Sequence, residues 1–175
     1  VLSSLIFGLS SQKKKMSSYS RDQKKEMKKA ACAGDGAALM ALVKQYGVDI
    51  AAAKLDGGGY TALHYTARNA DDAAASGKAI AQLIAAAGAA IDIDARNKWG
   101  NTPLHYASAN GKLHQVGALV RCGASVDVKN NNGRTPTSLC CRKNKTAILA
   151  ELGIPPPVPV PNLLAGAKQI PTVTV

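Results

Sequence analysis

The histidines are the first residues to consider for chemistry, because an imidazole can act as a base, a nucleophile or a metal ligand near neutral pH. His105 lies in GNTPLHYA at residues 100–107, and His64 lies in the similar GYTALHYT at residues 59–66. No Ser, Cys or acidic residue lies at a spacing that would pair with either ring to activate a nucleophile. His114 is expected on the flank of a helix, in water. The residue types around these histidines therefore do not favour catalysis.

Other arrangements that carry chemistry are missing from the sequence. It has no glycine-rich phosphate loop, no HExxH motif and no pair of cysteines at zinc spacing. Asp71 and Asp72 are adjacent carboxylates, but neighbouring side chains on a helix point apart, so a polar loop is a better interpretation than a metal or acid–base pair. We expect no enzyme activity, no catalytic, cofactor or metal site, and no small-molecule substrate.

The cysteines and the apolar segments bear on the compartment. Cys32, Cys122 and the neighbours Cys140 and Cys141 form no CxxC pair, and we interpret them as buried thiols in a reducing compartment. No segment reaches the roughly 18 apolar residues of a membrane span. In the opening VLSSLIFGL the lysines follow the apolar residues, which is the wrong order for a secretory signal. The sequence predicts an intracellular protein of the cytoplasm or the mitochondrial matrix.

Positive charge is concentrated near the beginning of the chain. The formal net charge is +11, and residues 1–29 hold eight bases and two acids, a net charge of +6. Basic side chains attract anionic partners, so nucleic acid or an acidic protein is a candidate here. Nucleic acid is not favoured, because charge runs are usually solvated and Tyr19 alone offers base stacking after the first lysines. The candidate contacts are Lys13, Lys14, Lys15, Lys24, Lys25 and Lys28.

A phrase recurs along the chain, and its spacing predicts a repeated structural unit. Thr102-Pro103 and Thr135-Pro136 lie 33 residues apart, and Thr61 precedes Thr102 by 41 residues. A threonine at a helix start caps free N–H groups, and a proline in the first helical position loses no hydrogen bond. A glycine such as Gly123 then ends the second helix in the left-handed conformation. Each phrase predicts two short helices, and successive pairs must stack because neither helix can bury its apolar stripe alone.

The phrases GNTPLHYASANG and GASVD resemble those of the ankyrin repeat family, whose 33-residue unit is a β-turn followed by two antiparallel helices. The resemblance covers about residues 25–153. It implies an all-α solenoid of stacked helix-turn-helix units with β-turn or hairpin loops, and with extended N- and C-terminal arms. The expected division is a basic arm at 1–21, repeats at 22–56, 57–93, 94–127 and 128–153 in one domain at 22–153, and a proline-rich arm at 154–175.

Three features depart from the repeat pattern. The unit beginning at Thr61 carries eight extra residues, which we place mostly in RNADDAAASGKA, as a lengthened loop between its helices; this loop is either functional or a tolerated insertion. Ser138 stands where the other units have histidine. Thr146 and Glu151 stand where the family usually carries leucine, which implies a final helix with one face in water. The resemblance also implies that the TPLH histidine is structural and ties neighbouring loops through its ring nitrogens.

The resemblance implies that partners bind at the turn tips and on the concave face of the first helices. Trp99, the only tryptophan, stands where the repeat normally has a small polar residue and is flanked by Arg96 and Lys98. This composition is typical of an interface hot spot; the alternative is that Trp99 packs against the neighbouring tip. The residues expected to bind protein are Arg68, Asn69, Arg96, Lys98, Trp99, Ser108, Asn110, Lys129, Asn131, Arg134 and Arg142.

Two functions fit this organisation. The first is a non-catalytic accessory subunit, docked by its stack and both arms in a larger intracellular assembly. Residues 154–175 hold six of the eight prolines, which favours an extended arm that only another surface could order. The second is a free-standing adaptor or inhibitor that binds one partner protein through its concave face. An RNA-contacting subunit of a ribonucleoprotein is a less favoured third function.

Overall fold

The computed structural model describes residues 19–70, 74–140 and 144–153, and these residues form helices, turns and loops without any strand. The predicted all-α fold is confirmed. Outside the described residues lie residues 1–18 of the predicted basic arm, with Lys13, Lys14 and Lys15, the whole predicted proline-rich arm at 154–175, and Arg142. The elements in chain order are α2 (Arg21–Ala33), α3 (Gly36–Tyr46), α4 (Asp49–Ala52), α5 (Ala62–Asn69), α6 (Ala74–Ala87), the 3-10 turn η2 (Gly88–Ala90), α7 (Pro103–Ala109), α8 (Leu113–Arg121), the 3-10 turn η3 (Thr137–Leu139) and α9 (Lys145–Glu151).

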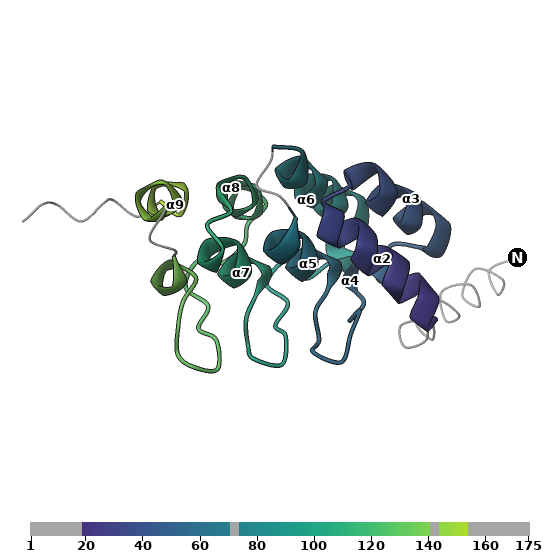
Figure 1. Ribbon diagram of the computed structural model, residues 1–175, viewed down its shortest axis with the longest axis horizontal. Coiled ribbons are helices and arrows are strands. Elements are labelled where there is room, and N and C mark those ends of the chain that lie inside the picture. Colours follow the sequence, from purple (N-terminus) through teal and green to yellow (C-terminus); the bar gives the residue numbers. More distant parts are fainter. Residues whose placement is uncertain (1–18, 71–73, 141–143, 154–175) are drawn as a thin grey trace, which may run out of the picture.

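The helices lie in two rows, with a series of long loops beside them (Figure 1). In the first row α2 packs on α5, α5 on α7 and α7 on η3. In the second row α3 packs on α6, α6 on α8 and α8 on α9. The long loops between units project together at the lower edge of the view. The structure is thus a solenoid in which each helix pair rests on its neighbours.

Local sequence determines where the first two helices begin and end. Ser20 and Gln23 exchange side-chain and backbone hydrogen bonds of 2.8 and 3.2 Å, which form a capping box at the start of α2. Gly34 ends α2 in the left-handed conformation at φ 66°, and the Asp35 carboxylate caps α3. Arg21, which we expected at the end of the basic arm, is the first residue of α2.

The core runs through the whole stack between the two rows of helices. Its members are mainly aliphatic, and burying a Leu or Ile side chain contributes about 1.5–3 kcal/mol. Because the core is continuous, each unit depends on its neighbours for burial. The largest fully buried apolar side chains are Met27, Leu39, Ile50, Leu63, Ile80, Leu83, Leu104, Leu119 and Ile148.

The extra residues of the Thr61 unit mainly lengthen a helix. Helix α6 has 14 residues, whereas its counterpart α8 has nine. A Cβ at Gly77, near the start of α6, would lie 2.9 Å from the His114 carbonyl oxygen of α8, so this added part of the helix packs directly on the next unit. The prediction of a lengthened loop is therefore wrong for most of the insertion, because its Ala-rich sequence favours a helix that can pack.

The last unit is reduced. The first helix of this unit is only the three-residue turn η3, and α9 follows with seven residues. Ile148 is fully buried in α9, whereas Thr146 and Glu151 are exposed. The expected final helix with one face in water is therefore present.

Candidate functional site

The loops at the lower edge of Figure 1 end in three tips, which comprise residues 54–60, 96–101 and 129–134. One side chain closes each tip by accepting two backbone N–H bonds, from the residues two and four positions further on. Asp56, Asn97 and Asn130 do this at 2.9 to 3.1 Å. The tips are therefore turns of the same construction, as the recurring sequence predicted.

Adjacent tips are hydrogen-bonded to one another. The Lys98 N–H donates to the Gly58 carbonyl at 3.0 Å, and the Asn131 N–H donates to the Trp99 carbonyl at 3.1 Å. The Asn131 side-chain amide also donates to the Lys98 carbonyl at 2.9 Å, and the Arg96 guanidinium donates to the Lys129 carbonyl at the same distance. These bonds join the tips into one continuous surface that is ordered before any partner binds.

The histidines of the recurring phrase join each first helix to the following tip. The Thr61 N–H and hydroxyl lie 3.2 and 2.9 Å from His64 Nδ1, and His64 Nε2 lies 3.0 Å from the Asn101 carbonyl. His105 repeats the arrangement with Thr102 and the Arg134 carbonyl. This network assigns the proton to Nε2. The structural role that the resemblance implied is thus visible in the geometry.

Burial lowers the pKa of His64 and of His105, and the carbonyl that accepts from each ring offsets this only in part. Protonation would place a second N–H at Nδ1, opposite the threonine N–H that already donates there. Both rings are therefore held neutral as hydrogen-bond bridges between units.

A tyrosine cluster lies behind the first two tips. The Tyr60 and Tyr106 hydroxyls are 2.8 Å apart, and the Asn97 amide donates to the Tyr106 hydroxyl at 2.9 Å. The Tyr65 hydroxyl donates to the Asp56 carboxylate. Tyr60 and Tyr65 are buried, and Tyr106 is half-buried. The cluster thus bonds α5 to the first tip and α7 to the second.

The cluster also changes the acid–base properties of its members. Burial, together with the hydrogen bond to Tyr106, raises the pKa of Tyr60 to about 12. Burial acts to raise the pKa of Asp56, but the hydrogen bonds from Tyr65 and from two backbone N–H groups, with the charge of Lys28, hold it below its ordinary value. At neutral pH Tyr60 and Tyr65 are therefore neutral and the Asp56 carboxylate is ionised.

Arg68 lies at the end of α5 in front of this cluster. Its guanidinium carbon is 5.7 Å from the ring centroids of both Tyr60 and Tyr106, and its Nη1 donates to the Tyr60 hydroxyl at 3.4 Å. The Asn110 amide donates to the Arg68 carbonyl at 3.1 Å. Because the two rings and the Tyr60 hydroxyl contact the guanidinium, its position is defined. Arg68 is also exposed, so this cation is accessible on the first-helix face.

Trp99 projects from the second tip with 53% of its surface exposed. Its ring centroid lies 5.7 Å from that of Tyr60, and its ring edge would lie 3.2 Å from a Cβ at Gly58 in the first tip. One side of the ring therefore packs on the neighbouring tip, as the alternative interpretation expected. The other side is exposed, and its role in binding a partner stays a prediction.

Ser108 does not belong to the surface, contrary to expectation. It is fully buried, and its hydroxyl has no hydrogen-bond partner among the described residues. The reason is helical spacing, since Ser108 lies four residues after the buried Leu104 on the same face of α7. The other predicted protein-binding residues within the described part of the chain are exposed, namely Arg68, Asn69, Arg96, Lys98, Trp99, Asn110, Lys129, Asn131 and Arg134.

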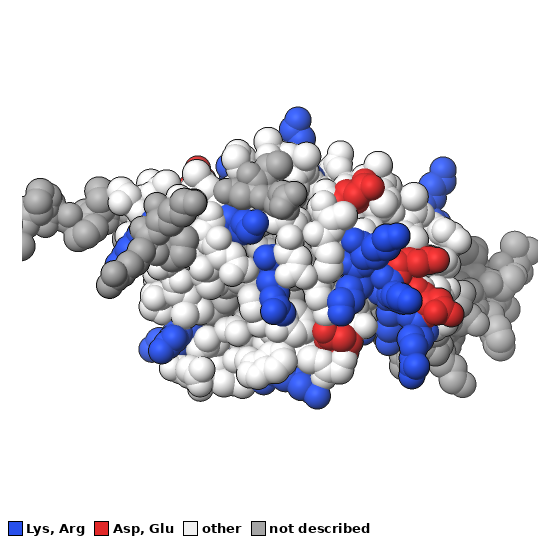
Figure 2. Space-filling model, viewed as in Figure 1, with Lys and Arg blue, Asp and Glu red and all other residues white. Residues whose placement is uncertain are grey.

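The lysines assigned to a basic arm lie on α2 where the structure describes them. Figure 2 shows the Lys and Arg side chains gathered over this helix, with acidic side chains among them. Lys25 is exposed, whereas Lys28 lies 4.7 Å above the Tyr65 ring. Asp22 and Glu26 are interleaved on the same helix, and Glu26 accepts a hydrogen bond from Tyr46. This helix therefore presents mixed charge rather than a continuous basic track.

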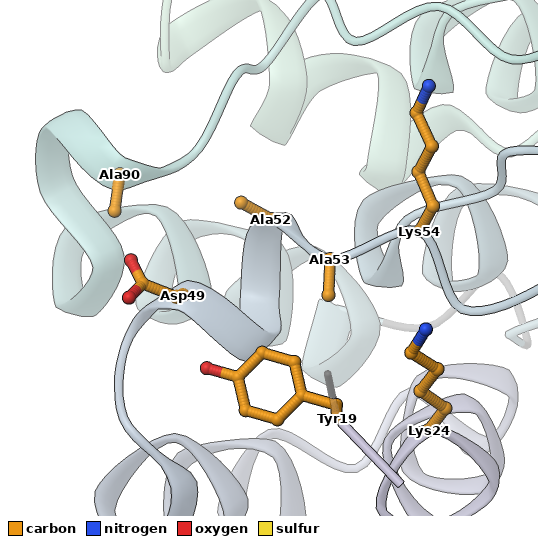
Figure 3. Close-up of a pocket in the computed structure, with 7 residues that line it drawn as sticks. All are labelled: Tyr19, Lys24, Asp49, Ala52, Ala53, Lys54 and Ala90. Atoms are coloured by element: carbon orange, nitrogen blue, oxygen red, sulfur yellow. The ribbon is translucent and has the colours of Figure 1, made fainter. Parts of the chain in front are cut away.

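A pocket of about 300 Å³ lies where α2 meets α4 (Figure 3). The Tyr19 hydroxyl points toward Asp49, and Lys24 and Lys54 lie at the other side of the lining. Burial and the nearby Asp49 carboxylate raise the pKa of Tyr19. This lining has no set of ligands for a metal, and no group of three such side chains occurs elsewhere in the described residues. Nor is any described helix long and apolar enough to cross a membrane.

The tip surface is consequently the best-defined candidate site, and sequence reasoning found only part of it. The exposed basic residues and Trp99 were identified from the repeat. The tyrosine cluster was missed, although Tyr65 and Tyr106 each follow a phrase histidine directly and aromatic residues make up only 4% of the chain. The sequence did contain an indication of the cluster, because three of the five tyrosines lie in two equivalent phrases.

Comparison with known proteins agrees with this geometry. Residues 71–154 match a family model described as ankyrin repeats, in three copies. The human ankyrin repeat domain-containing protein SOWAHB is 31% identical over 106 residues, which make up 58% of this chain and 13% of that protein. Protein fem-1 homolog A of Danio rerio is 43% identical over 61 residues, 35% of this chain and 10% of that protein.

A third relative shows how local the likeness is. Human palmitoyltransferase ZDHHC13 is 37% identical over 49 residues, 28% of this chain and 8% of the enzyme. The chain spans about an eighth or less of the length of these three relatives, so the similarity concerns their repeats. Such repeats indicate a protein–protein interaction module. The matched repeats, the stacked helix pairs and the histidine-linked tips together show that residues 71–154 of this chain are ankyrin repeats.

Proposed function

We propose that this chain is a non-catalytic accessory subunit that docks on a partner protein within a larger intracellular assembly. The observation that carries the proposal is Trp99, a large apolar side chain that is half exposed on an ordered tip. Tryptophan and arginine are enriched among the residues that dominate binding energy at interfaces. Trp99 has Arg96 beside it in the second tip and Arg68 on the nearby first-helix face.

The ordered state of the tips supports the same proposal. Bonds between Lys98 and Gly58, and between Asn131 and Trp99, already fix the backbone of the surface. A surface that is fixed in advance loses little conformational entropy when a partner binds, so more of the contact energy appears as affinity. The polar groups of the tips bond with one another, which suits recognition better than reaction chemistry.

The proposal places the module in a reducing compartment, either the cytoplasm or the mitochondrial matrix. Its support is the thiols of Cys32, Cys122 and Cys140, which form no disulfide among the described residues and are half-buried rather than buried as predicted. Small apolar thiols of this kind persist in reducing compartments.

The test is affinity purification of the full-length chain from the cells that express it, comparing wild type with Trp99→Ala. Val48→Ala is the matched control, because Val48 is the other large apolar side chain exposed in the described residues, at 40%, and it lies between α3 and α4. We expect Trp99→Ala to lower recovery of a stoichiometric partner at least about tenfold, with little change in melting temperature. Full recovery of the partner with Trp99→Ala would contradict the proposal.

A free-standing adaptor or inhibitor would use the same surface, so the two functions differ in the rest of the chain. Deletion of residues 155–175 should reduce retention in a multi-subunit complex if the proline-rich segment docks there. The native mass of the purified complex gives a second readout. If the chain and its partner form a one-to-one complex whose affinity is unchanged by the deletion, the adaptor function would replace the subunit function as the proposal.

A further inference from the structure

We infer that the tips recognise an acidic segment of the partner, with one of its apolar side chains seated against Trp99. This inference rests on the proposed protein-binding function and adds the chemistry of the partner. Three features carry it: the charge of the tips, the fixed positions of two arginines, and the place of the single exposed ring among them.

The tips are basic. By sequence they contain one acidic residue, Asp56, and its carboxylate already accepts hydrogen bonds from Tyr65 and from two backbone N–H groups. Figure 2 shows Lys and Arg side chains along the lower edge, where Figure 1 places the tips. The exposed bases of the tips are Lys54, Arg96, Lys98, Lys129 and Arg134.

The other carboxylates in the loops after α6 and α8 do not neutralise this surface. Asp94 accepts from the Ser125 N–H at 3.0 and 3.2 Å through its two oxygens and so holds two loops together. Asp92 and Asp127 are exposed but lie earlier in their loops, toward the ends of α6 and α8. A partner that contacts the tips therefore meets mainly cations, and complementary charge both speeds encounter and selects the partner.

Two arginines are held in place, Arg96 in the second tip and Arg68 of α5 beside the tips. The Arg68 guanidinium lies against the rings of Tyr60 and Tyr106. The Arg96 guanidinium donates to the Lys129 carbonyl at 2.9 Å and keeps further N–H groups for a ligand. A guanidinium held in this way matches a carboxylate through two parallel N–H donors, and less entropy is lost when the bonds form.

The exposed aromatic surface favours a peptide over a nucleic acid. Single strands are held by successive bases that stack on several open rings. Trp99 is open at the tips, but Tyr60 of the first tip and Tyr65 behind it are buried, and their hydroxyls are hydrogen-bonded. One open ring between cations suits one apolar side chain within an acidic segment.

The probe is a displayed library of random 12-residue peptides, selected on the full-length chain at low salt. We expect the enriched peptides to be rich in Asp and Glu and to share one Leu, Phe or Trp. An individual enriched peptide should bind Lys98→Glu/Arg134→Glu at least about tenfold more weakly than wild type. It should bind Lys78→Glu as wild type does, because Lys78 is an exposed cation on α6 in the second row of helices. Raising salt from 50 to 300 mM should weaken the wild-type complex, since exposed charges are screened.

Three results would overturn the inference: enriched peptides that are neutral or basic, enrichment equal on Lys98→Glu/Arg134→Glu, or no enrichment on wild type. A 12-nucleotide oligo-dT that binds wild type more tightly than the best peptide and loses affinity in the same variant would replace the peptide by nucleic acid. The purification with Trp99→Ala is scored separately. If Trp99→Ala loses its co-purified partner but the library selects no acidic peptides, the proposed protein-binding function is supported. Only the inference that the partner segment is acidic is then wrong.

Discussion

The second and third tips have nearly the same sequence pattern, yet they differ in what lies beside them. The second tip is bonded on both sides, to the first tip through Lys98 and to the third through Trp99. The third tip is bonded on one side, and no further tip follows among the described residues. This difference shows which residues of the repeat stabilise the turn itself and which contact the neighbouring turn.

Histidine and serine show the contrast most clearly. His105 reaches across to the Arg134 carbonyl of the following tip. At the equivalent place in the last unit, the Ser138 hydroxyl turns back and donates to the Thr135 carbonyl at 2.8 Å. The ring is useful only where the described chain supplies a carbonyl to receive it, so a short side chain suffices at the end of the stack.

The largest effect that tests this contrast is expected from His105→Ala. The change leaves the Arg134 carbonyl and the Thr102 N–H without their partner and opens a cavity at a nearly fully buried position. We expect the free energy of unfolding to fall by about 2–4 kcal/mol, measured by urea denaturation. Ser138→Ala, at an exposed position, should cost less than about 1 kcal/mol. Equal losses in the two variants would show that the bond between units is unimportant.

The glycines of the tips provide a second matched pair. Gly100 and Gly133 both have φ near +73°, where an added side chain costs about 1–2 kcal/mol. A Cβ at Gly100 would also lie 2.8 Å from the Asn131 backbone nitrogen, whereas one at Gly133 meets no described atom within 4 Å. Gly100→Ala should therefore lower the free energy of unfolding by about 1–3 kcal/mol more than Gly133→Ala. If thermal unfolding shows that the two variants lose equal stability, packing between adjacent tips is not the reason that position 100 requires glycine.

Acid should weaken the histidine-linked units. Because burial lowers the pKa of His64 and His105 in the fold, the unfolded chain, with a His pKa of about 6.5, takes up protons more readily. Stability should be insensitive to these groups well above pH 6.5 and should fall as the pH drops below it. The slope of unfolding free energy against pH between 5 and 6.5 should therefore decrease in His105→Asn. An unchanged slope in His105→Asn would contradict this account.

The fold could be predicted from the sequence because the ends of the repeated helices are determined by residues close to them in the chain. Thr102-Pro103 encodes a helix start and Gly123 a helix end, and both act within a few residues. The histidine role came from the family resemblance, and the geometry agrees with it. The Thr61 insertion was misplaced as a loop because length alone does not show whether extra residues continue a helix.

The candidate site was predictable only in outline. The exposed cations and Trp99 follow from their places in the turn. Ser108 was placed on the surface because the boundary between the concave and buried faces of a short helix shifts with one residue of register. The tyrosine cluster depends on contacts between residues up to 46 positions apart, such as Tyr60 with Tyr106, and no local pattern encodes that distance.

The smallest effect is expected at the other edge of the last unit, where an ion pair joins α8 to α9. Arg121 Nη1 lies 3.8 Å from Glu151 Oε2, with 70% and 41% of the two side chains exposed. An exposed pair of this kind contributes about 0.2–1 kcal/mol and is screened by salt, whereas Ile148 of α9 is fully buried in the core. The coupling energy from a double-mutant cycle of Arg121→Ala and Glu151→Gln should therefore not exceed about 1 kcal/mol and should vanish in 0.5 M salt. A coupling above 1 kcal/mol would mean that charge holds the last unit to the stack in addition to the His105 bond to Arg134.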